Sequence, residues 1–167
     1  TAFTKSGKYT LKVGDRLSYP FLIDNEVYKE VKNAALKSYY LQRVSMPIEE
    51  EYAGIYKRPK GHDDMGLLFH PSTDKTGTLD SPGGWYDAGD FNKYVNYAYG
   101  AVQDLLSAYE ENPWVFPDDY GIPESNNGVP DLLDELKWEL DWLLKMQIAD
   151  GSVLMKVSVN AFQSASP

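Results

Sequence analysis

The stretch VPDLLDELKWELDWLLKMQ, residues 129–147, decides the predicted fold class. Apolar side chains recur every three or four residues for about five turns, which is the pattern of an amphipathic helix. Pro130 stands near the first helical position, acidic residues crowd the early turns and Lys145 lies near the end, all of which suit the helix dipole. The dipeptide Asp150-Gly151 marks the stop. The predicted buried face of this helix consists of Leu132, Leu133, Leu136, Leu140, Leu143, Leu144 and Met146.

Two further segments, residues 25–43 and 92–111, show helical spacing, so the predicted fold is mainly α. Residues 8–23 alternate between apolar and polar positions and predict one or two strands, while residues 152–159 predict a strand or an extended loop. Residues 44–92 are mostly irregular, and so long a stretch inside a domain is usually functional or disordered. Its aromatic residues and histidines argue against disorder, so we expect a site on the loops.

The composition narrows the classes of protein. The 167 residues, 43% of them apolar, suffice for one ordinary domain. A net charge of −9 without a basic stripe argues against a nucleic-acid partner, and no apolar run approaches the roughly 20 residues of a membrane span. The first ten residues show no signal-peptide pattern, so we expect any export signal to lie outside this sequence. The absence of cysteine excludes disulfides, and the 14% aromatic residues suit either a tyrosine-rich core or the binding of sugar rings.

The stretch GGWYDAGDFNKYV, residues 83–95, places Asp87 and Asp90 three residues apart. Three roles are open to this pair. The carboxylates could bridge a metal, although hard cations prefer more than two oxygen ligands. Asp90 could cap the helix that starts near Asn92. Alternatively the pair could hold a water molecule, one carboxylate accepting its proton and the other orienting it, and the crowding of two anions would raise the proton affinity of one.

Three blocks of the sequence resemble glycoside hydrolase family 9, the inverting cellulases. GGWYDAGDFNKYV is similar to the family signature around the water-activating aspartates. IPESNNGVPDLLDELKWELDWLLKMQ is similar to a later family helix, with Asn126 where glycine is usual. SYPFLID and YKEVKNAALKSYYLQR resemble the lead-in to the first barrel helix and that helix itself. The blocks stand in the family's order and spacing, which makes the match specific.

The resemblance implies hydrolysis of β-1,4-glucosidic bonds in cellulose or a related β-glucan, with inversion of configuration. It implies that Asp90 is the general base that deprotonates water and that Asp87 orients this water. It also implies that Trp85 and Tyr86 bind the substrate beside the cleft.

The resemblance further implies a truncated catalytic domain. Residues 24–167 would form the opening portion of an (α/α)6 barrel, and residues 1–23 the last strand and linker of an immunoglobulin-like module. An inverting acid and base stand about 6.5–9.5 Å apart, so Asp87 and Asp90 are too near each other to fill both roles. The family's acid is a late glutamate without a counterpart here, and the resemblance makes Glu124 a structural loop residue. We therefore expect a β-glucan and the rest of the catalytic domain as partners, no turnover by this chain alone, and a secreted, periplasmic or cell-surface location.

Many relatives hold a structural zinc through two cysteines and two histidines. The matching positions here are Val44, Gly61, His62 and Tyr86. Because tetrahedral zinc needs four donors, we expect no metal and no cofactor, and we expect His62 to be a hydrogen-bonded loop histidine. Asp63 and Asp64 would be solvated or would cap the backbone. Met155 replaces a polar residue of the family's next strand, so the substrate could differ from plain cellulose.

Two other functions stay open. The chain could be a non-catalytic module that stacks glucan chains on Trp85, Tyr86 and other loop aromatics. It could also be a helical interaction domain whose acidic loops stay solvated. The aspartate pair favours the enzyme, because binding alone does not need two crowded carboxylates.

Overall fold

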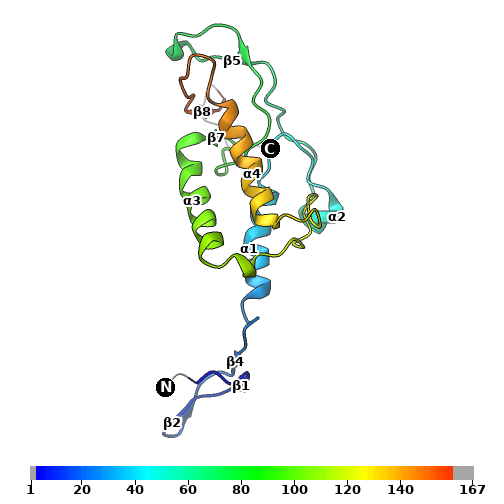
Figure 1. Cartoon of the computed structure of the whole chain (residues 1–167), viewed down its shortest axis with the longest axis vertical. Coiled ribbons are helices and arrows are strands. Elements are labelled where there is room, and N and C mark those ends of the chain that lie inside the picture. The colour runs from blue at the N-terminus through cyan, green and yellow to red at the C-terminus, as the bar shows by residue number, and fades with distance from the viewer. Residues whose placement is uncertain (1–2, 160–167) are drawn as a thin grey trace. The chain divides into compact units, whose positions relative to one another are not determined.

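The computed structural model describes residues 3–159 and divides the chain into two compact units, Thr1–Leu36 and Lys37–Pro167 (Figure 1). The helix α1, Lys29–Leu41, crosses from the first unit into the second. The outer ends of the two predicted domains, residues 1–2 and 160–167, lie outside the described residues. The predicted domain boundary between residues 23 and 24 stays a prediction.

The first unit contains four short strands ahead of α1. Strand β1, Gly7–Tyr9, pairs antiparallel with β4, Phe21–Ile23, and β2, Lys12–Val13, pairs with β3, Arg16–Leu17. The sequence predicts only one or two strands here. The difference arises because Gly14, with a φ of +59°, turns the chain back after β2 and so makes an extra hairpin.

Helix α1 begins four residues later than the predicted start at residue 25. Residues 25–28 form turns instead, and the Asp24 carboxylate accepts a hydrogen bond from the Glu26 N–H at 2.8 Å. Such a local bond satisfies the backbone without a helix, which explains the later start.

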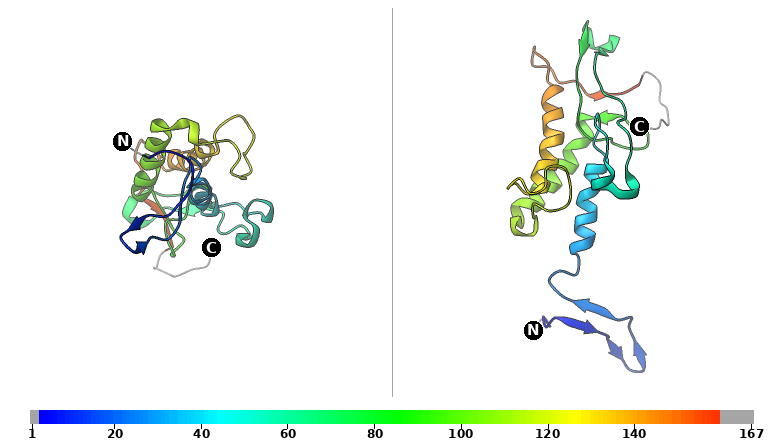
Figure 2. Two further views of the ribbon diagram at one scale, coloured as in Figure 1. Left: turned by 90° about the horizontal axis from the view of Figure 1, so that it is seen from below. Right: turned by 90° about the vertical axis from the view of Figure 1, so that its right-hand side faces the viewer.

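In the second unit, α3, Val95–Glu111, and α4, Asp131–Lys145, lie side by side and run in opposite directions (Figures 1 and 2). Both predicted helices are therefore confirmed. Helix α3 starts later than predicted because β7, Lys93–Tyr94, pairs antiparallel with β8, Lys156–Val157. This pairing also confirms the extended segment predicted after the third helix.

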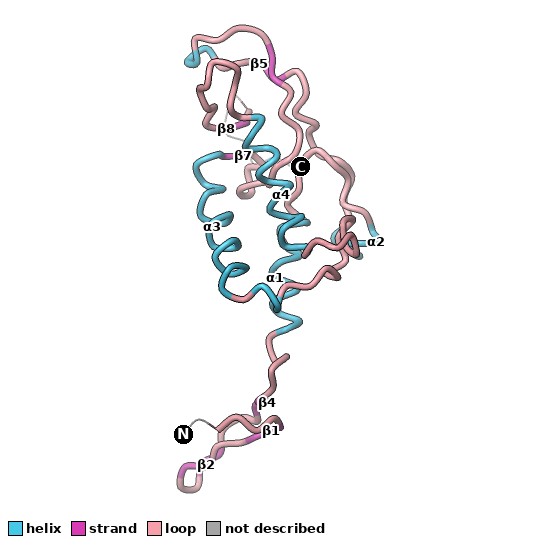
Figure 3. The backbone as a smooth tube through the Cα atoms, in the orientation of Figure 1, coloured by secondary structure: helices cyan, strands magenta, loops and turns pink. Residues whose placement is uncertain are grey.

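The long segment between α1 and α3 is mostly loop, as predicted (Figure 3). The short elements of the second unit are α2, Glu50–Ala53; η1, Gly54–Tyr56; β5, Leu67–Leu68; η2, Pro71–Thr73; β6, Thr78–Leu79; and η3, Pro113–Val115. Strands β5 and β6 pair antiparallel. A buried cluster of Tyr40, Ile48, Ala53 and Ile122 anchors the start of this segment. Among the described helices, none has the length and apolar character needed to cross a membrane.

The buried face of α4 differs from the prediction. Leu132, Leu136 and Met146 are buried as predicted, but Leu140 is 39% exposed and Leu144 is 72% exposed. The positions buried in their place are Asp131, Glu135, Glu139 and Trp142. Three carboxylates spaced by four residues thus share the inner face of the helix. Burial of a carboxylate requires hydrogen-bond donors or a positive charge, and both are present around this face.

Candidate active site

The segment that carries both aspartates, residues 83–93, is called the aspartate loop. The chain that follows α1 holds its first part. Arg43 and Trp85 form an antiparallel β-bridge, and the Val44 N–H donates to the Gly84 carbonyl at 2.8 Å. The loop therefore starts from a backbone position that is fixed by hydrogen bonds.

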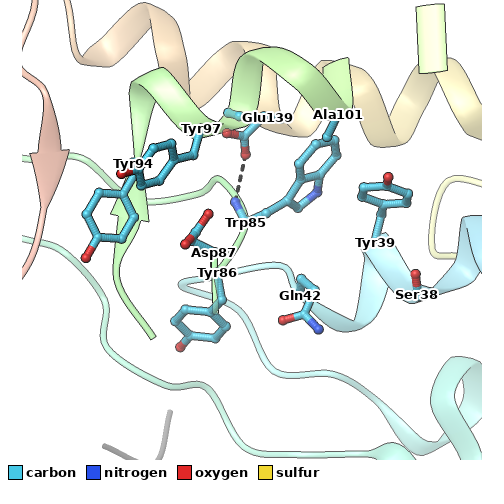
Figure 4. Close-up of a pocket in the computed structure, with 11 residues that line it drawn as sticks. Ser38, Tyr39, Gln42, Trp85, Tyr86, Asp87, Tyr94, Tyr97, Ala101 and Glu139 are labelled. Atoms are coloured by element: carbon cyan, nitrogen blue, oxygen red, sulfur yellow. Dashed lines mark hydrogen bonds between the residues drawn. The ribbon is translucent and has the colours of Figure 1, made fainter. Parts of the chain in front are cut away.

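Helix α4 holds the same part of the loop through side chains. The Trp85 backbone N–H donates to Glu139 Oε2 at 2.7 Å (Figure 4). The Trp85 indole Nε1–H donates to Glu135 Oε1 at 2.7 Å. The Trp138 indole donates to the Gly84 carbonyl at 3.0 Å. The buried carboxylates of α4 thus serve as acceptors for the aspartate loop.

The buried guanidinium of Arg43 compensates part of this negative charge. It lies 3.0 Å from Glu135 Oε2 and 2.9 Å from Glu124 Oε1. Glu124 is therefore a structural loop residue, as predicted. Burial raises the pKa of Glu135, although Arg43 opposes the shift, and burial raises the pKa of Glu139 to about 7.

Gly84 is required where the loop crosses α4. Its backbone φ is +80°, a value that residues other than glycine rarely adopt. A Cβ atom at this position would lie 2.7 Å from Trp142 Cδ2. The backbone of the loop can therefore approach the helix this closely only without a side chain.

Asp87 and Asp90 face different surroundings. The Asp87 N–H donates to the Asn92 carbonyl at 3.0 Å, which closes the loop between them. The Asp90 carboxylate accepts from the Asn92 side-chain amide at 2.8 Å, from the Asn92 N–H at 3.2 Å and from the Tyr94 hydroxyl at 2.8 Å. Because α3 starts at Val95 with Tyr94 as its N-cap residue, Asp90 does not cap this helix.

These surroundings move the two pKa values apart. Burial, and then the charge of Asp90, raise the pKa of Asp87. Burial alone would raise the pKa of Asp90, but the hydrogen bonds from Tyr94 and Asn92 outweigh it and lower the pKa. The sequence predicts that crowding raises the proton affinity of one carboxylate and makes it the better base. The raised pKa belongs to Asp87, through burial first and the charge of Asp90 second, and not to Asp90, to which the resemblance gives the role of base.

A pocket of about 310 Å³ lies beside the loop (Figure 4). Its lining residues are Ser38, Tyr39, Gln42, Trp85, Tyr86, Asp87, Tyr94, Tyr97, Ala98, Ala101 and Glu139. Asp87 lies among these aromatic rings, whereas Asp90 is not part of the lining. Such a pocket suits a sugar ring, because aromatic rings can stack on the apolar faces of the sugar and a carboxylate can accept hydrogen bonds from its hydroxyl groups.

Trp85 and Tyr86 both contribute to this pocket but are only 7% and 4% exposed. The Trp85 ring packs against Tyr39 with ring centroids 4.9 Å apart, and the Tyr86 ring meets Phe91 edge-on at 5.1 Å. Most of their surface therefore serves packing within the described chain. Their predicted role in substrate binding stays a prediction.

His62 and Asp64 form a chain of polar contacts with Lys93, the last residue of the aspartate loop. His62 Nδ1 lies 2.6 Å from Asp64 Oδ1, and Asp64 Oδ2 lies 2.7 Å from Lys93 Nζ. The predicted hydrogen-bonded role of His62 is confirmed. The prediction that Asp64 is solvated or caps the backbone is wrong, because Asp64 is 4% exposed and carries an ion pair. Asp63, by contrast, has a side chain 57% exposed.

The positions that correspond to the relatives' zinc ligands do not fit a metal. Val44 and Gly61 have no donor side chain, and both ring nitrogens of His62 already face protein oxygens, at Asp64 and at the Phe91 carbonyl. Within residues 3–159, no three His, Cys, Asp or Glu side chains gather as metal ligands. The expected absence of zinc stays a prediction.

Comparison with known proteins identifies the class of protein. The model of glycosyl hydrolase family 9 matches residues 28–164, and the chain belongs to this family. A xyloglucan-specific endo-β-1,4-glucanase of Bacteroides ovatus is 44% identical over 98% of this chain. Endoglucanase D of Acetivibrio thermocellus is 38% identical over 97% of this chain.

Solved structures agree with this assignment. A family 9 glycoside hydrolase of Bacteroides ovatus superimposes with a TM-score of 0.83 at 44% identity, covering 96% of this chain and 30% of that protein. A metagenome-derived family 9 endoglucanase gives a TM-score of 0.74 at 41% identity. The chain spans 29% and 27% of the two curated relatives, so it corresponds to part of their length.

Proposed function

We propose that this chain carries the water-activating part of an inverting glycosidase that cleaves β-1,4-glucosidic bonds in cellulose or a related β-glucan. The observation that carries the proposal is the pair of Asp87 and Asp90 in one hydrogen-bonded loop beside an aromatic pocket. The family membership supports it, as do the relatives named as endo-β-1,4-glucanase and endoglucanase.

The proposed roles follow from the two environments. Asp90, whose pKa is lowered, stays ionised in mildly acidic solution and accepts the proton of the attacking water. Asp87 accepts the second hydrogen bond of the same water and orients its oxygen toward the anomeric carbon. Since the pKa of Asp87 is raised, Asp87 is the first of the two to be protonated as the pH falls. Loss of this oriented water then sets the acidic limit of activity.

The proposal places the general acid outside this sequence. Inversion needs an acid about 6.5–9.5 Å from the base, so that a water molecule fits between base and sugar. Glu124 is a poor candidate because it forms an ion pair with the buried Arg43. The chain alone is therefore expected to bind a β-glucan without cleaving it, and the rest of the catalytic domain is a proposed partner.

The finer architecture is also part of the proposal. Residues 24–167 are assigned to the opening portion of an (α/α)6 barrel, supported by the antiparallel pair of α3 and α4. Residues 1–23 are assigned to the end of an immunoglobulin-like module, supported by the four short strands. A polymeric glucan does not cross membranes, so we assign the protein to a secreted, periplasmic or cell-surface location.

The experiment uses the longest gene product that contains this chain. Asp90→Asn and Asp87→Asn are assayed on soluble cellulose and xyloglucan derivatives for hydrolysis and, separately, for binding. We expect both variants to lose at least about 100-fold in kcat and to bind glucan nearly as before. Asp104→Asn, at an exposed position on α3, is the matched control and should keep full activity. Hydrolysis retained by Asp90→Asn would show that the base is assigned wrongly. Hydrolysis retained by both variants would show that this chain does not carry the catalytic aspartates, and a binding module would then be the better description of this chain.

A further inference from the structure

The carbonyl group of Phe91 connects the aspartate loop to His62. Phe91 follows Asp90 directly and has a φ of +53°, a conformation that residues other than glycine adopt at a cost of about 1–2 kcal/mol. His62 Nε2 lies 3.0 Å from the Phe91 carbonyl oxygen. This contact fixes the orientation of the Phe91–Asn92 peptide group, whose Asn92 N–H donates to Asp90 Oδ1 at 3.2 Å.

Both ring nitrogens of His62 face acceptors. Nδ1 meets an Asp64 carboxylate oxygen at 2.6 Å, and Nε2 meets the Phe91 carbonyl oxygen, which can only accept a hydrogen bond. A neutral imidazole donates from one nitrogen only, so one of the two contacts would be left without a proton. The doubly protonated ring satisfies both contacts.

Lys93 anchors the other end of this chain of contacts. Its side chain is fully buried, and Nζ donates to the carbonyl oxygens of Ser81 and Gly83 at 2.7 Å each and pairs with Asp64 Oδ2. Asp64 therefore connects His62 to Lys93. Lys93, the last residue of the aspartate loop, donates to the carbonyl of its first residue, Gly83, and His62 contacts the loop at Phe91.

The charges around His62 support the protonated ring. Asp64, on the same loop, raises the pKa of His62, while burial and the Lys93 ammonium from β7 oppose this shift. The Tyr86 ring meets the imidazole edge-on at 5.3 Å, and the Arg58 guanidinium lies over the Tyr86 ring, 5.2 Å from its centroid.

We infer that His62, bridged to Lys93 by Asp64, is a positioning residue that holds the Phe91 carbonyl and thereby sets the orientation of the Asp90 carboxylate for water activation. The inference rests on the proposed function, because it concerns how Asp90 is used. It assigns His62 a role in catalysis without contact to the substrate.

The kinetic test compares His62→Phe with His62→Gln in the longest gene product that contains this chain. Phenylalanine keeps the ring beside Tyr86 and removes both hydrogen bonds, whereas glutamine returns an N–H donor. We expect His62→Phe to lose about 10- to 100-fold in kcat with KM changed less than about twofold, and His62→Gln to recover part of this loss. His70→Gln, on the neighbouring exposed loop, is the control and should match the unsubstituted enzyme. A normal kcat in His62→Phe, or a loss confined to KM, would overturn the inference.

A second measurement needs no variant. Nitrogen NMR of the longest gene product that contains this chain should show His62 Nε2 protonated at pH 6, because this nitrogen lies 3.0 Å from the Phe91 carbonyl oxygen, which can only accept a hydrogen bond. A His62 ring that carries its proton on Nδ1 alone would overturn the inference, because Nε2 could then not donate to the Phe91 carbonyl. The two proposals fail separately. If Asp90→Asn stays active, the proposed function fails whatever the ring spectrum shows, and if Asp90→Asn is inactive while His62→Phe is normal, only the positioning role fails.

Discussion

Substitution of Gly84 by alanine should destabilise the chain more than the same substitution at its neighbour Gly83. Both glycines have positive φ values, +80° and +95°, so both variants carry the backbone cost of about 1–2 kcal/mol. Only at Gly84 does the new methyl group meet Trp142, at 2.7 Å. At Gly83 the nearest atoms are the Lys145 ammonium nitrogen at 3.8 Å and Trp142 Cβ at 3.9 Å, which is ordinary contact distance.

Overpacking a fixed core costs about 1–3 kcal/mol, so Gly84→Ala should lower the free energy of unfolding by about 2–5 kcal/mol. Gly83→Ala should lower it by about 1–2 kcal/mol. A typical domain is stable by about 5–15 kcal/mol, so the larger loss is a substantial fraction of the total.

Urea titrations of both variants, followed by tryptophan fluorescence, give the two values in the same buffer. The difference between the variants isolates the contact with Trp142, since the backbone cost is shared. Equal losses in the two variants would refute the claim that close approach to α4 requires Gly84. A Gly84→Ala variant with unchanged stability would refute the backbone argument as well.

Two further predictions concern titration. Glu139 has its pKa raised from 4.5 to about 7 in the folded chain, so the folded state binds more protons than the unfolded state between these values. The contribution of Glu139 to the free energy of unfolding is therefore full below pH 4.5 and is lost, by up to about 3 kcal/mol, as the pH rises through 7. Glu139→Gln should flatten this part of the curve of unfolding free energy against pH. An unchanged slope would contradict the raised pKa of Glu139. Tyr94→Phe removes a hydroxyl that donates to Asp90, so carboxyl-carbon NMR should report a higher pKa for Asp90, whereas Tyr97→Phe should leave it unchanged. An equal response to both tyrosine substitutions would exclude a specific role for the Tyr94 hydroxyl.

The sequence predicts the helices and the aspartate pair because these signals are local. Spacing of three and four residues identifies α4, and the adjacent glycines and aromatics identify the loop with Asp87 and Asp90. The start of α3 is shifted because β7 pairs with β8, which lies more than 60 residues further along the chain. No local pattern carries that information.

The buried polar residues are what the sequence does not predict. Arg43, Asp64 and Lys93 are ordinary surface residues by type, and their burial follows from partners that are distant in sequence. Glu135 and Glu139 likewise read as residues of an exposed helix face. Their burial follows from Trp85, whose N–H groups donate hydrogen bonds to both carboxylates. One signal was available for Lys93, which stands among aromatic and apolar neighbours just after the aspartates.

Chemical rescue tests the central claim most directly. The variant Asp90→Ala, made in the longest gene product that contains this chain, lacks the carboxylate that is proposed to deprotonate the attacking water. Azide needs no deprotonation and is small enough to occupy the vacated position. We expect azide to restore cleavage in proportion to its concentration and to yield an α-configured glycosyl azide, as attack from the face opposite the leaving sugar requires. No rescue, or a product of β configuration, would contradict the account of Asp90 as the base of a single inverting displacement.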